Sequence, residues 1–342
     1  MASVRVLAFV GVAFLGSLAS AQDFDTVKTP NGLQIGETKS ITAMEVVLKQ
    51  AAGDKAIPVN EVEWVSFKGE PRELKQIRAD VTRAAWDDVI TELEKLKLTG
   101  DERPEIKQDA EFYMALAKAK LALAGKGDVA DAGKLVFPFI KEHRSSYHFL
   151  QANELLGDLL AANRNFEQAS RYYAEVAKVE WPDYKMRANL ALGRALLAQK
   201  KYDDAKQKFA EVVSVAASGK QADTSKMLAA VGQAECLTET GQAEQAVPMI
   251  EQVIAKAPAD AQEVYARAYI TLGNSYRKLN QPKQALLAFL HIPVLFSAYP
   301  ESHAEALANL RTLWNEVNQP DRAKEAEQVL LERYPNSRWV KQ

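Results

Sequence analysis

The spacing of apolar and polar residues changes character near residue 71. Between residues 41 and 67, short runs rich in Val, Ile, Phe and Trp are separated by turn residues, a pattern typical of strands. From Arg72 onward Ala, Leu, Lys, Glu and Gln dominate, and apolar residues recur every three or four positions between short polar breaks. The chain therefore predicts a small β-rich module followed by a long series of α-helices.

The helical part repeats itself with a fixed internal spacing. A small residue is followed twelve residues later by Ala, sixteen later by an aromatic residue or Ile, and nineteen later by Val or Ile. Four successive copies carry these positions: Gly157, Ala169, Tyr173 and Val176; Gly193, Ala205, Phe209 and Val212; Ala234, Ala246, Ile250 and Val253; Gly273, Ala285, Phe289 and Ile292. We expect the small residue and the Ala to meet where helices cross at short backbone distance, and the larger side chain to fill the space between neighbouring pairs.

This spacing, in segments such as LLGDLLAANRNFEQASRYYAEV, resembles tetratricopeptide repeats. The resemblance implies a mainly α fold, a right-handed α-α superhelical solenoid preceded by the small β-rich module. It is strong over residues 145–342, whereas residues 72–144 are predicted to form degenerate helical repeats. A last copy is partial, with Arg311 in place of the small residue and Glu327 in place of the aromatic one. About seven helix pairs are expected in total.

The repeats are longer than the standard unit. Successive Ala positions stand 36, 41, 39 and 38 residues apart, against about 34 for a typical repeat. We therefore expect extra loop residues, most clearly at residues 215–224 and 293–302.

Residues 22–71 form the β-rich module in this interpretation. Residues 22–40 are polar and predicted to begin loosely ordered, and a hairpin or meander follows as far as Phe67. Either residues 22–40 complete a small barrel-like sheet, or the hairpin packs on the helices. The module is then either a binding module of SH3-like or Sm-like type or a cap over the end of the repeat array.

The first 21 residues have the pattern of a secretory signal peptide. Arg5 precedes an almost wholly apolar run, Val6 to Leu18, and Ala19-Ser20-Ala21 offers a small-residue cleavage site. The run is about 13 residues long, whereas a spanning helix needs about 20. We expect cleavage after Ala21, export to the periplasm or the extracellular space, and no membrane insertion of the mature chain.

Composition narrows the chemistry. The chain carries 43 basic and 45 acidic residues, so its net charge of −2 argues against a nucleic-acid partner. The single cysteine, Cys236, excludes an intramolecular disulfide and a multi-cysteine metal site; it is expected in the core, with pairing between chains as the alternative. His143 and His148 are expected to be ordinary interhelix histidines. The sequence predicts no catalytic residue, no cofactor and no metal site, and the protein is not expected to be an enzyme.

The resemblance also indicates which side chains face the concave groove. In the family, positions six before and one after the small residue point inward; they are Gln151, Asp158, Arg187, Arg194, Leu228, Glu235, Arg267 and Asn274, with Arg277 one turn further. The candidate partner-binding residues are Arg187, Arg194, Arg267, Asn274 and Arg277. They would bind an acidic segment or a C-terminal carboxylate. Leu190 and Ile270, however, stand where carboxylate-clamp repeats place polar or basic residues. Alternatively, the arginines neutralise Asp158 and Glu235 or lie in solvent.

The expected function is a non-catalytic scaffold or adaptor that contacts a protein or peptide partner in a bacterial periplasm or cell envelope. The alternative is a ligand-binding protein whose N-terminal module recognises a glycan, a peptide or a nucleic acid and is displayed by the helices. The repeat pattern specifies neither the partner nor the oligomeric state.

Overall fold

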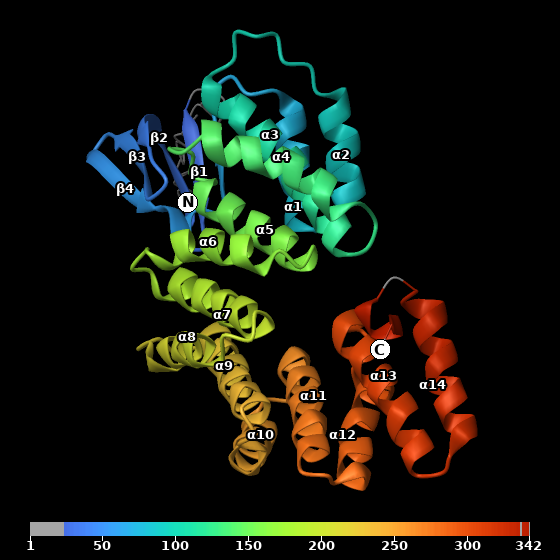
Figure 1. The fold of residues 1–342 in the computed structure, drawn as a ribbon. Coiled ribbons are helices and arrows are strands. Elements are labelled where there is room, and N and C mark those ends of the chain that lie inside the picture. The colour runs from blue at the N-terminus through green and yellow to red at the C-terminus, as the bar shows by residue number, and fades with distance from the viewer. Residues whose placement is uncertain (1–23, 336, 342) are drawn as a thin grey trace, which may run out of the picture.

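The computed structural model describes residues 24–335 and 337–341 (Figure 1). The predicted signal peptide, residues 1–21, lies outside the described residues. Within them, a five-stranded sheet precedes 14 α-helices, which confirms the mainly α fold with a small β-rich start. The helices from α5 to α14 follow an arc, and the sheet lies beside α1–α6 at the N-terminal end of that arc (Figure 1).

The sheet is antiparallel throughout, with the order β4-β3-β2-β1-β5. This order is linear among the described strands, so β4 and β5 lie at its edges rather than closing a barrel. The strands are β1 (Asp25–Thr29), β2 (Gly32–Ile41), β3 (Glu45–Gln50), β4 (Gly53–Pro58) and β5 (Trp64–Ser66).

Residues 25–41 form the long hairpin β1–β2, so the expectation of a loosely ordered start is wrong for them. The buried carboxylate of Asp25 accepts hydrogen bonds from the amides of Thr38 (2.9 Å) and Lys68 (2.7 Å) and from Arg103 Nη1 (2.9 Å). Burial alone would raise the pKa of Asp25, but these bonds lower it. The polar composition of the segment therefore reflects buried hydrogen bonding instead of disorder.

The helices form seven consecutive antiparallel pairs within the described residues, which is the number that the repeats predict. No helix among the described residues combines the length and the apolar character needed to cross a bilayer. The bounds are α1 (Arg72–Thr82), α2 (Trp86–Lys95), α3 (Pro104–Leu123), α4 (Val129–Glu142), α5 (Phe149–Ala162), α6 (Phe166–Ala177), α7 (Pro182–Ala198), α8 (Tyr202–Ser214), α9 (Lys220–Glu239), α10 (Ala243–Lys256), α11 (Gln262–Lys278), α12 (Pro282–Leu295), α13 (Pro300–Glu316) and α14 (Pro320–Arg333).

The extra residues of the longer repeats are helical where we expected loops. Residues 220–224 belong to α9, which is 20 residues long against 17 for α7. α12 continues through Pro293 to Leu295, because buried Phe289 and Ile292 hold its last turns in the core. The predicted loops at residues 215–224 and 293–302 are therefore wrong for about half of their length, since residues 215–219 and 296–299 do lie between helices.

Each of the last five pairs turns through the same backbone conformation. Seven residues after the small position, one residue adopts a positive φ of 57–80°, and the next amide bonds to the carbonyl five residues before it. This arrangement satisfies carbonyls at the end of the first helix and reverses the chain. The residues are Arg164, Lys200, Gly241, Asn280 and Asn318.

The repeat glycines make room for an aromatic ring. A Cβ at Gly157, Gly193 or Gly273 would lie 2.5–2.7 Å from a ring atom of the aromatic residue sixteen positions later. The nearest neighbour is thus this ring, and not the Ala twelve positions later that we expected. Phe209 is also 2.5 Å from a Cβ placed at Gly232 of α9, so its ring lies between two helix pairs, as the repeat pattern predicted.

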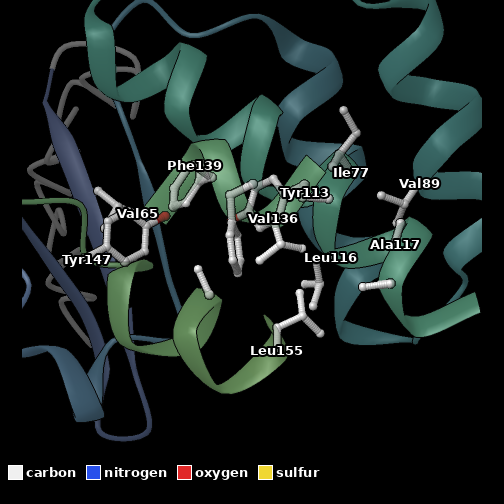
Figure 2. Close-up of a cluster of buried hydrophobic side chains, with 14 of the residues drawn as sticks. Val65, Ile77, Val89, Tyr113, Leu116, Ala117, Val136, Phe139, Tyr147 and Leu155 are labelled. Atoms are coloured by element: carbon white, nitrogen blue, oxygen red, sulfur yellow. The ribbon is translucent and has the colours of Figure 1, made fainter. Parts of the chain in front are cut away.

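The sheet and the first helices share one hydrophobic core. Val65 of β5 belongs to the same buried cluster as Ile77 of α1, Phe139 of α4 and Leu155 of α5 (Figure 2). The hydrophobic face of the sheet is therefore covered by helices, as in a cap on the repeat array.

A buried polar network ties the start of this core together. The carboxylate of Asp109 on α3 accepts hydrogen bonds from Tyr147 Oη (2.9 Å) and pairs with His148 Nε2 (3.1 Å). Arg78 on α1 lies 3.9 Å from the other oxygen of Asp109 and forms a two-pronged ion pair with Glu70, just after the sheet. The network joins the end of the sheet to α1, to α3 and to the start of α5.

Candidate functional site on the first helices

The first helices of the last four pairs, α7, α9, α11 and α13, form one continuous layer. α7 contacts α9, α9 contacts α11, and α11 contacts α13, while each also packs on its own second helix. Predicted groove positions therefore lie on adjoining helices. We call the set Arg194, Glu235, Arg267, Asn274 and Glu305 the inner charged face.

Two of the candidate arginines are already engaged. Arg187 donates two hydrogen bonds to Glu154, at 2.9 and 3.0 Å, and its guanidinium lies 4.4 Å from the ring centre of Tyr184. Arg194 on α7 reaches across to Glu263 at the start of α11, at 3.1 Å. The acids that neutralise these arginines are therefore Glu154 and Asp183 for Arg187 and Glu263 for Arg194.

Asn274 and Arg277 of α11 both point to α13. Asn274 Nδ2 donates to Glu305 Oε1 at 2.9 Å, and Arg277 Nη1 donates to Asn309 Oδ1. These contacts cross-link the first helices of the last two pairs, which is a structural role for both side chains.

Arg267 differs from the other candidates. Its half-buried guanidinium has no hydrogen bond or ion pair within residues 24–335 and 337–341. Loss of hydration, followed by the like charge of Arg267, lowers the pKa of Arg194, so the two guanidinium groups are neighbours. Glu235 and Glu305 are also close enough to Arg267 for it to lower their pKa values.

Two carboxyl groups on this face have raised pKa values. Burial is the main cause for both; the charge of Glu239 further raises the pKa of Glu235, and the charge of Glu235 further raises that of Glu305. The pKa of Glu305 is raised to about 7, although the bond from Asn274 and the charge of Arg267 oppose the rise. As pH rises through about 7, Glu305 therefore loses its proton and the inner charged face gains one negative charge.

Replacing Glu305 by Gln should stabilise the protein above pH 7. The unfolded carboxyl titrates near 4.5 and the folded one near 7. Between these values the native state binds more protons, so the contribution of Glu305 to the free energy of unfolding falls as pH rises. We expect the free energy of unfolding of E305Q to exceed that of the natural chain by about 1–2 kcal/mol at pH 8 and to equal it at pH 4. Urea unfolding at the two pH values measures this, and an equal or lower stability of E305Q at pH 8 would contradict it.

Asp158, the groove position of α5, serves the packing of its own repeat. Its carboxylate accepts a 2.8 Å hydrogen bond from Tyr173 Oη, and burial raises its pKa. Tyr173 is the ring that occupies the space above Gly157. Asp158 thus holds that ring in place and does not pair with the candidate arginines.

Sequence reasoning missed three acids that shape this face: Glu154, Glu263 and Glu305. Glu305 stands six residues before Arg311, so the groove rule applied to the partial last copy would have found it. Glu154 stands three residues before Gly157, the position that Leu190 and Ile270 occupy in later copies, so the same comparison would have found it. Glu263 lies outside all these positions, and no sequence signal marks it.

His143, His148 and Cys236 contact or are buried among other residues of the fold. His143 Nε2 lies 2.8 Å from Glu111, and His148 is buried beside Asp109. Cys236 is buried as expected, and burial raises the pKa of its thiol to about 12. Among the described residues, no group of three or more His, Cys, Asp or Glu side chains is arranged to hold a metal ion.

Comparison with known proteins places the fold. No protein-family model matches the sequence, and a search of curated proteins gives no match. The chain is similar to a tetratricopeptide repeat protein from Parabacteroides merdae, with 12% identity, a TM-score of 0.60 and coverage of 79% of this chain and 94% of that one.

Two further solved structures are similar to this chain. One is NprR in complex with its cognate peptide NprX, with 14% identity, a TM-score of 0.54 and coverage of 79% of each chain. The other is a Rap protein complexed with Competence and Sporulation Factor, with 13% identity, a TM-score of 0.56 and coverage of 76% and 75%. The chain therefore has the tetratricopeptide-repeat fold, as its repeat spacing predicted.

Proposed function

We propose that the protein is a non-catalytic scaffold that binds a segment of a protein or peptide partner on its inner charged face, with Arg267 pairing with one carboxylate of that segment. The observation that carries the proposal is the guanidinium of Arg267, which has neither a hydrogen bond nor an ion pair in the part of the chain that the structure describes. A half-buried guanidinium of this kind is completed by a carboxylate, which it binds with two parallel hydrogen bonds.

The similarity to NprR supports a peptide as the ligand. That protein has a comparable fold and was solved with its cognate peptide. In this chain, the face that would receive a peptide is built by the first helices, and Arg267 belongs to α11, which packs between α9 and α13.

The charges around Arg267 favour a single carboxylate over an acidic run. Arg194 provides a second positive charge nearby, but Glu235, Glu263 and Glu305 surround the two arginines. A stretch of acidic residues would meet repulsion from these carboxylates, whereas one C-terminal carboxylate or one acidic side chain fits between them. The proposal therefore narrows the acidic-segment hypothesis to one carboxylate.

A display experiment tests this preference. Peptides with free C-termini are selected on the natural chain, on R267Q and on R171Q, whose exposed arginine lies on the outer helix α6. We expect the natural chain and R171Q to select peptides that share one carboxylate at a fixed place, either the C-terminus itself or a single acidic side chain. R267Q should bind the selected peptides at least about tenfold more weakly than the natural chain does. Selection of the same peptides with equal affinity by R267Q would contradict the proposal.

We also propose export to the periplasm or the cell envelope. Arg5, the apolar run from Val6 to Leu18 and the small residues before Gln22 support this location. Cell fractionation tests it: a chain that begins at Gln22 in the periplasmic fraction supports the proposal, and an uncleaved chain in the cytosol contradicts it.

The shared core supports the interpretation of the N-terminal sheet as a cap on the repeat array and not as an independent binding module. Because Val65 and its sheet neighbours are buried together with α1–α5, the strands that the structure describes have no hydrophobic core of their own. Deleting residues 22–71 would expose this core, and we therefore assign partner binding to the helices.

A further inference from the structure

The outer surface of α12 carries an exposed apolar stripe. Leu287, Val294 and Leu295 are 61%, 72% and 60% exposed, and Leu290 between them is partly buried. Positions 287, 290 and 294 follow one another at spacings of three and four, so they form one continuous line along the helix. His291 on the same side stacks on Tyr269 of α11, with ring centres 4.0 Å apart.

The stripe is specific to this repeat. At the position of Leu287, the second helices α6, α8, α10 and α14 carry Arg171, Gln207, Pro248 and Glu325. At the position of Val294, they carry Lys178, Ser214, Ala255 and Glu332. Polar side chains therefore satisfy the fold at both places in α6, α8 and α14, while α10 carries the small residues Pro248 and Ala255. Packing within the chain does not explain why α12 has large apolar side chains there.

The charge pattern around the stripe indicates what it contacts. No Asp, Glu, Lys or Arg occurs between Lys283 and Glu301. A helix that lies on an anionic membrane usually carries a row of basic residues on its polar face, and α12 has only Lys283, in its first turn. A second copy of α12 can pack on the first without charge repulsion, because the stripe carries no charged side chain.

We propose that α12 is a self-association surface on which two copies of the chain pack α12 against α12 in antiparallel orientation. The two-fold axis passes near Leu290 and His291, so that Leu287 of one copy faces Val294 of the other. Lys283 of each copy then lies next to the C-terminal end of the other α12. That end has no basic residue in its last turn, so the lysine complements its unpaired carbonyls.

The available area predicts a weak dimer. At roughly 100 Å² for a fully exposed leucine or valine side chain, Leu287, Val294 and Leu295 offer about 200 Å² of apolar surface. A stable interface buries about 800 Å² on each partner. We therefore expect a dissociation constant of about 10⁻⁵–10⁻³ M, within reach at high local concentration.

Sedimentation velocity over a range of protein concentrations tests the proposal. The natural chain should shift from monomer to dimer as concentration rises, and the double variant L287Q/V294S should remain monomeric at the same concentrations. Both replacements imitate the sister repeat of α8, so the variant is expected to fold, which circular dichroism checks. L331Q, which removes an exposed leucine from α14 instead, is the matched control and should dimerise as the natural chain does. A natural chain that stays monomeric, alone or while it binds phospholipid vesicles, or a double variant that dimerises equally, would overturn the proposal.

Disulfide trapping tests the orientation. Cys236 is buried, so an introduced cysteine is the reactive one. L287C mixed with V294C should give more cross-linked dimer on mild oxidation with copper phenanthroline than either variant alone, and R171C on α6 should give little. Preferential cross-linking of L287C with itself would place residue 287 opposite its own copy and would overturn the proposed arrangement, in which the two-fold axis passes near Leu290 and His291.

Discussion

Replacing Asp109 by alanine is expected to lower the free energy of unfolding by about 4 kcal/mol, since removing one member of a buried ion network leaves its partners unpaired. Asp109 is fully buried and holds Tyr147 and His148 while it faces Arg78 at 3.9 Å. In D109A, Tyr147 and His148 would keep their desolvation cost and lose their common acceptor, and Arg78 would lose one neighbouring charge but keep its ion pair with Glu70. Urea unfolding followed by circular dichroism measures the change.

An exposed aspartate on the next helix provides the control. Asp131 of α4 pairs with Lys134, and both side chains are more than 70% exposed. D131A should change the free energy of unfolding by less than about 0.5 kcal/mol. Where D109A does not fold well enough to measure, D109N keeps one acceptor oxygen and should show a smaller loss. A loss of less than about 1 kcal/mol in D109A would mean that the network does not hold the sheet to the helices.

Replacing Gly193 by alanine is expected to destabilise the protein by about 2–3 kcal/mol, although alanine is the better helix former. The new Cβ would lie 2.6 Å from Cε1 of Phe209, which is nearly fully buried. The ring cannot move away, because its other side lies 2.5 Å from a Cβ built at Gly232. The clash must therefore shift α7 or α9.

Gly133 of α4 is the matched control. It is also a helical glycine, but a Cβ there has 3.8 Å to its nearest neighbour, Leu156. G133A should therefore raise the free energy of unfolding by about 0.5–1 kcal/mol. Opposite signs for the two glycine-to-alanine changes are the expected result, and a stabilising G193A would contradict the packing of the repeats.

The repeat spacing predicted the architecture well because it is set by close packing. A glycine and an aromatic ring sixteen residues apart can only be kept together by a fixed pair of helices, so Gly193 and Phe209 reveal the fold without any homologue. The sequence did not reveal the turn conformation that the repeats share. Gly241 and Asn280 favour a positive φ, but Arg164 and Lys200 do not, and tertiary packing imposes it on them.

The sequence predicted the candidate site less completely. The helical spacing correctly predicted that Arg194, Arg267 and Asn274 lie on one layer of helices, because the side of a helix on which a residue lies depends only on the period of the helix. It could not supply the partners of these side chains. Glu263 is 69 residues from Arg194 along the chain, and their meeting depends on how far each pair rotates on the next. The ordered start at Asp25 was missed for a similar reason, because its donors come from distant segments.

The ion pairs of Arg187 and Arg194 limit how a ligand can use these two side chains. Arg187 and Arg194 are neutralised by Glu154 and Glu263, so a ligand that used them would first have to displace these carboxylates. Arg267 needs no such exchange. We therefore expect Arg267 to account for most of the ionic part of binding, with Arg194 contributing through its charge.

A double-mutant cycle between Arg267 and the ligand carboxylate tests this account most directly. The dissociation constants of a selected peptide and of its amidated or Glu-to-Gln analogue are measured by titration calorimetry on the natural chain and on R267Q. If the two groups touch, removing either one should weaken binding at least about tenfold, and removing the second should add little, which gives a coupling energy of about 1.5–3 kcal/mol. A coupling energy near zero, with R267Q discriminating between the two peptides as well as the natural chain does, would contradict the assignment of Arg267 as the carboxylate-binding residue.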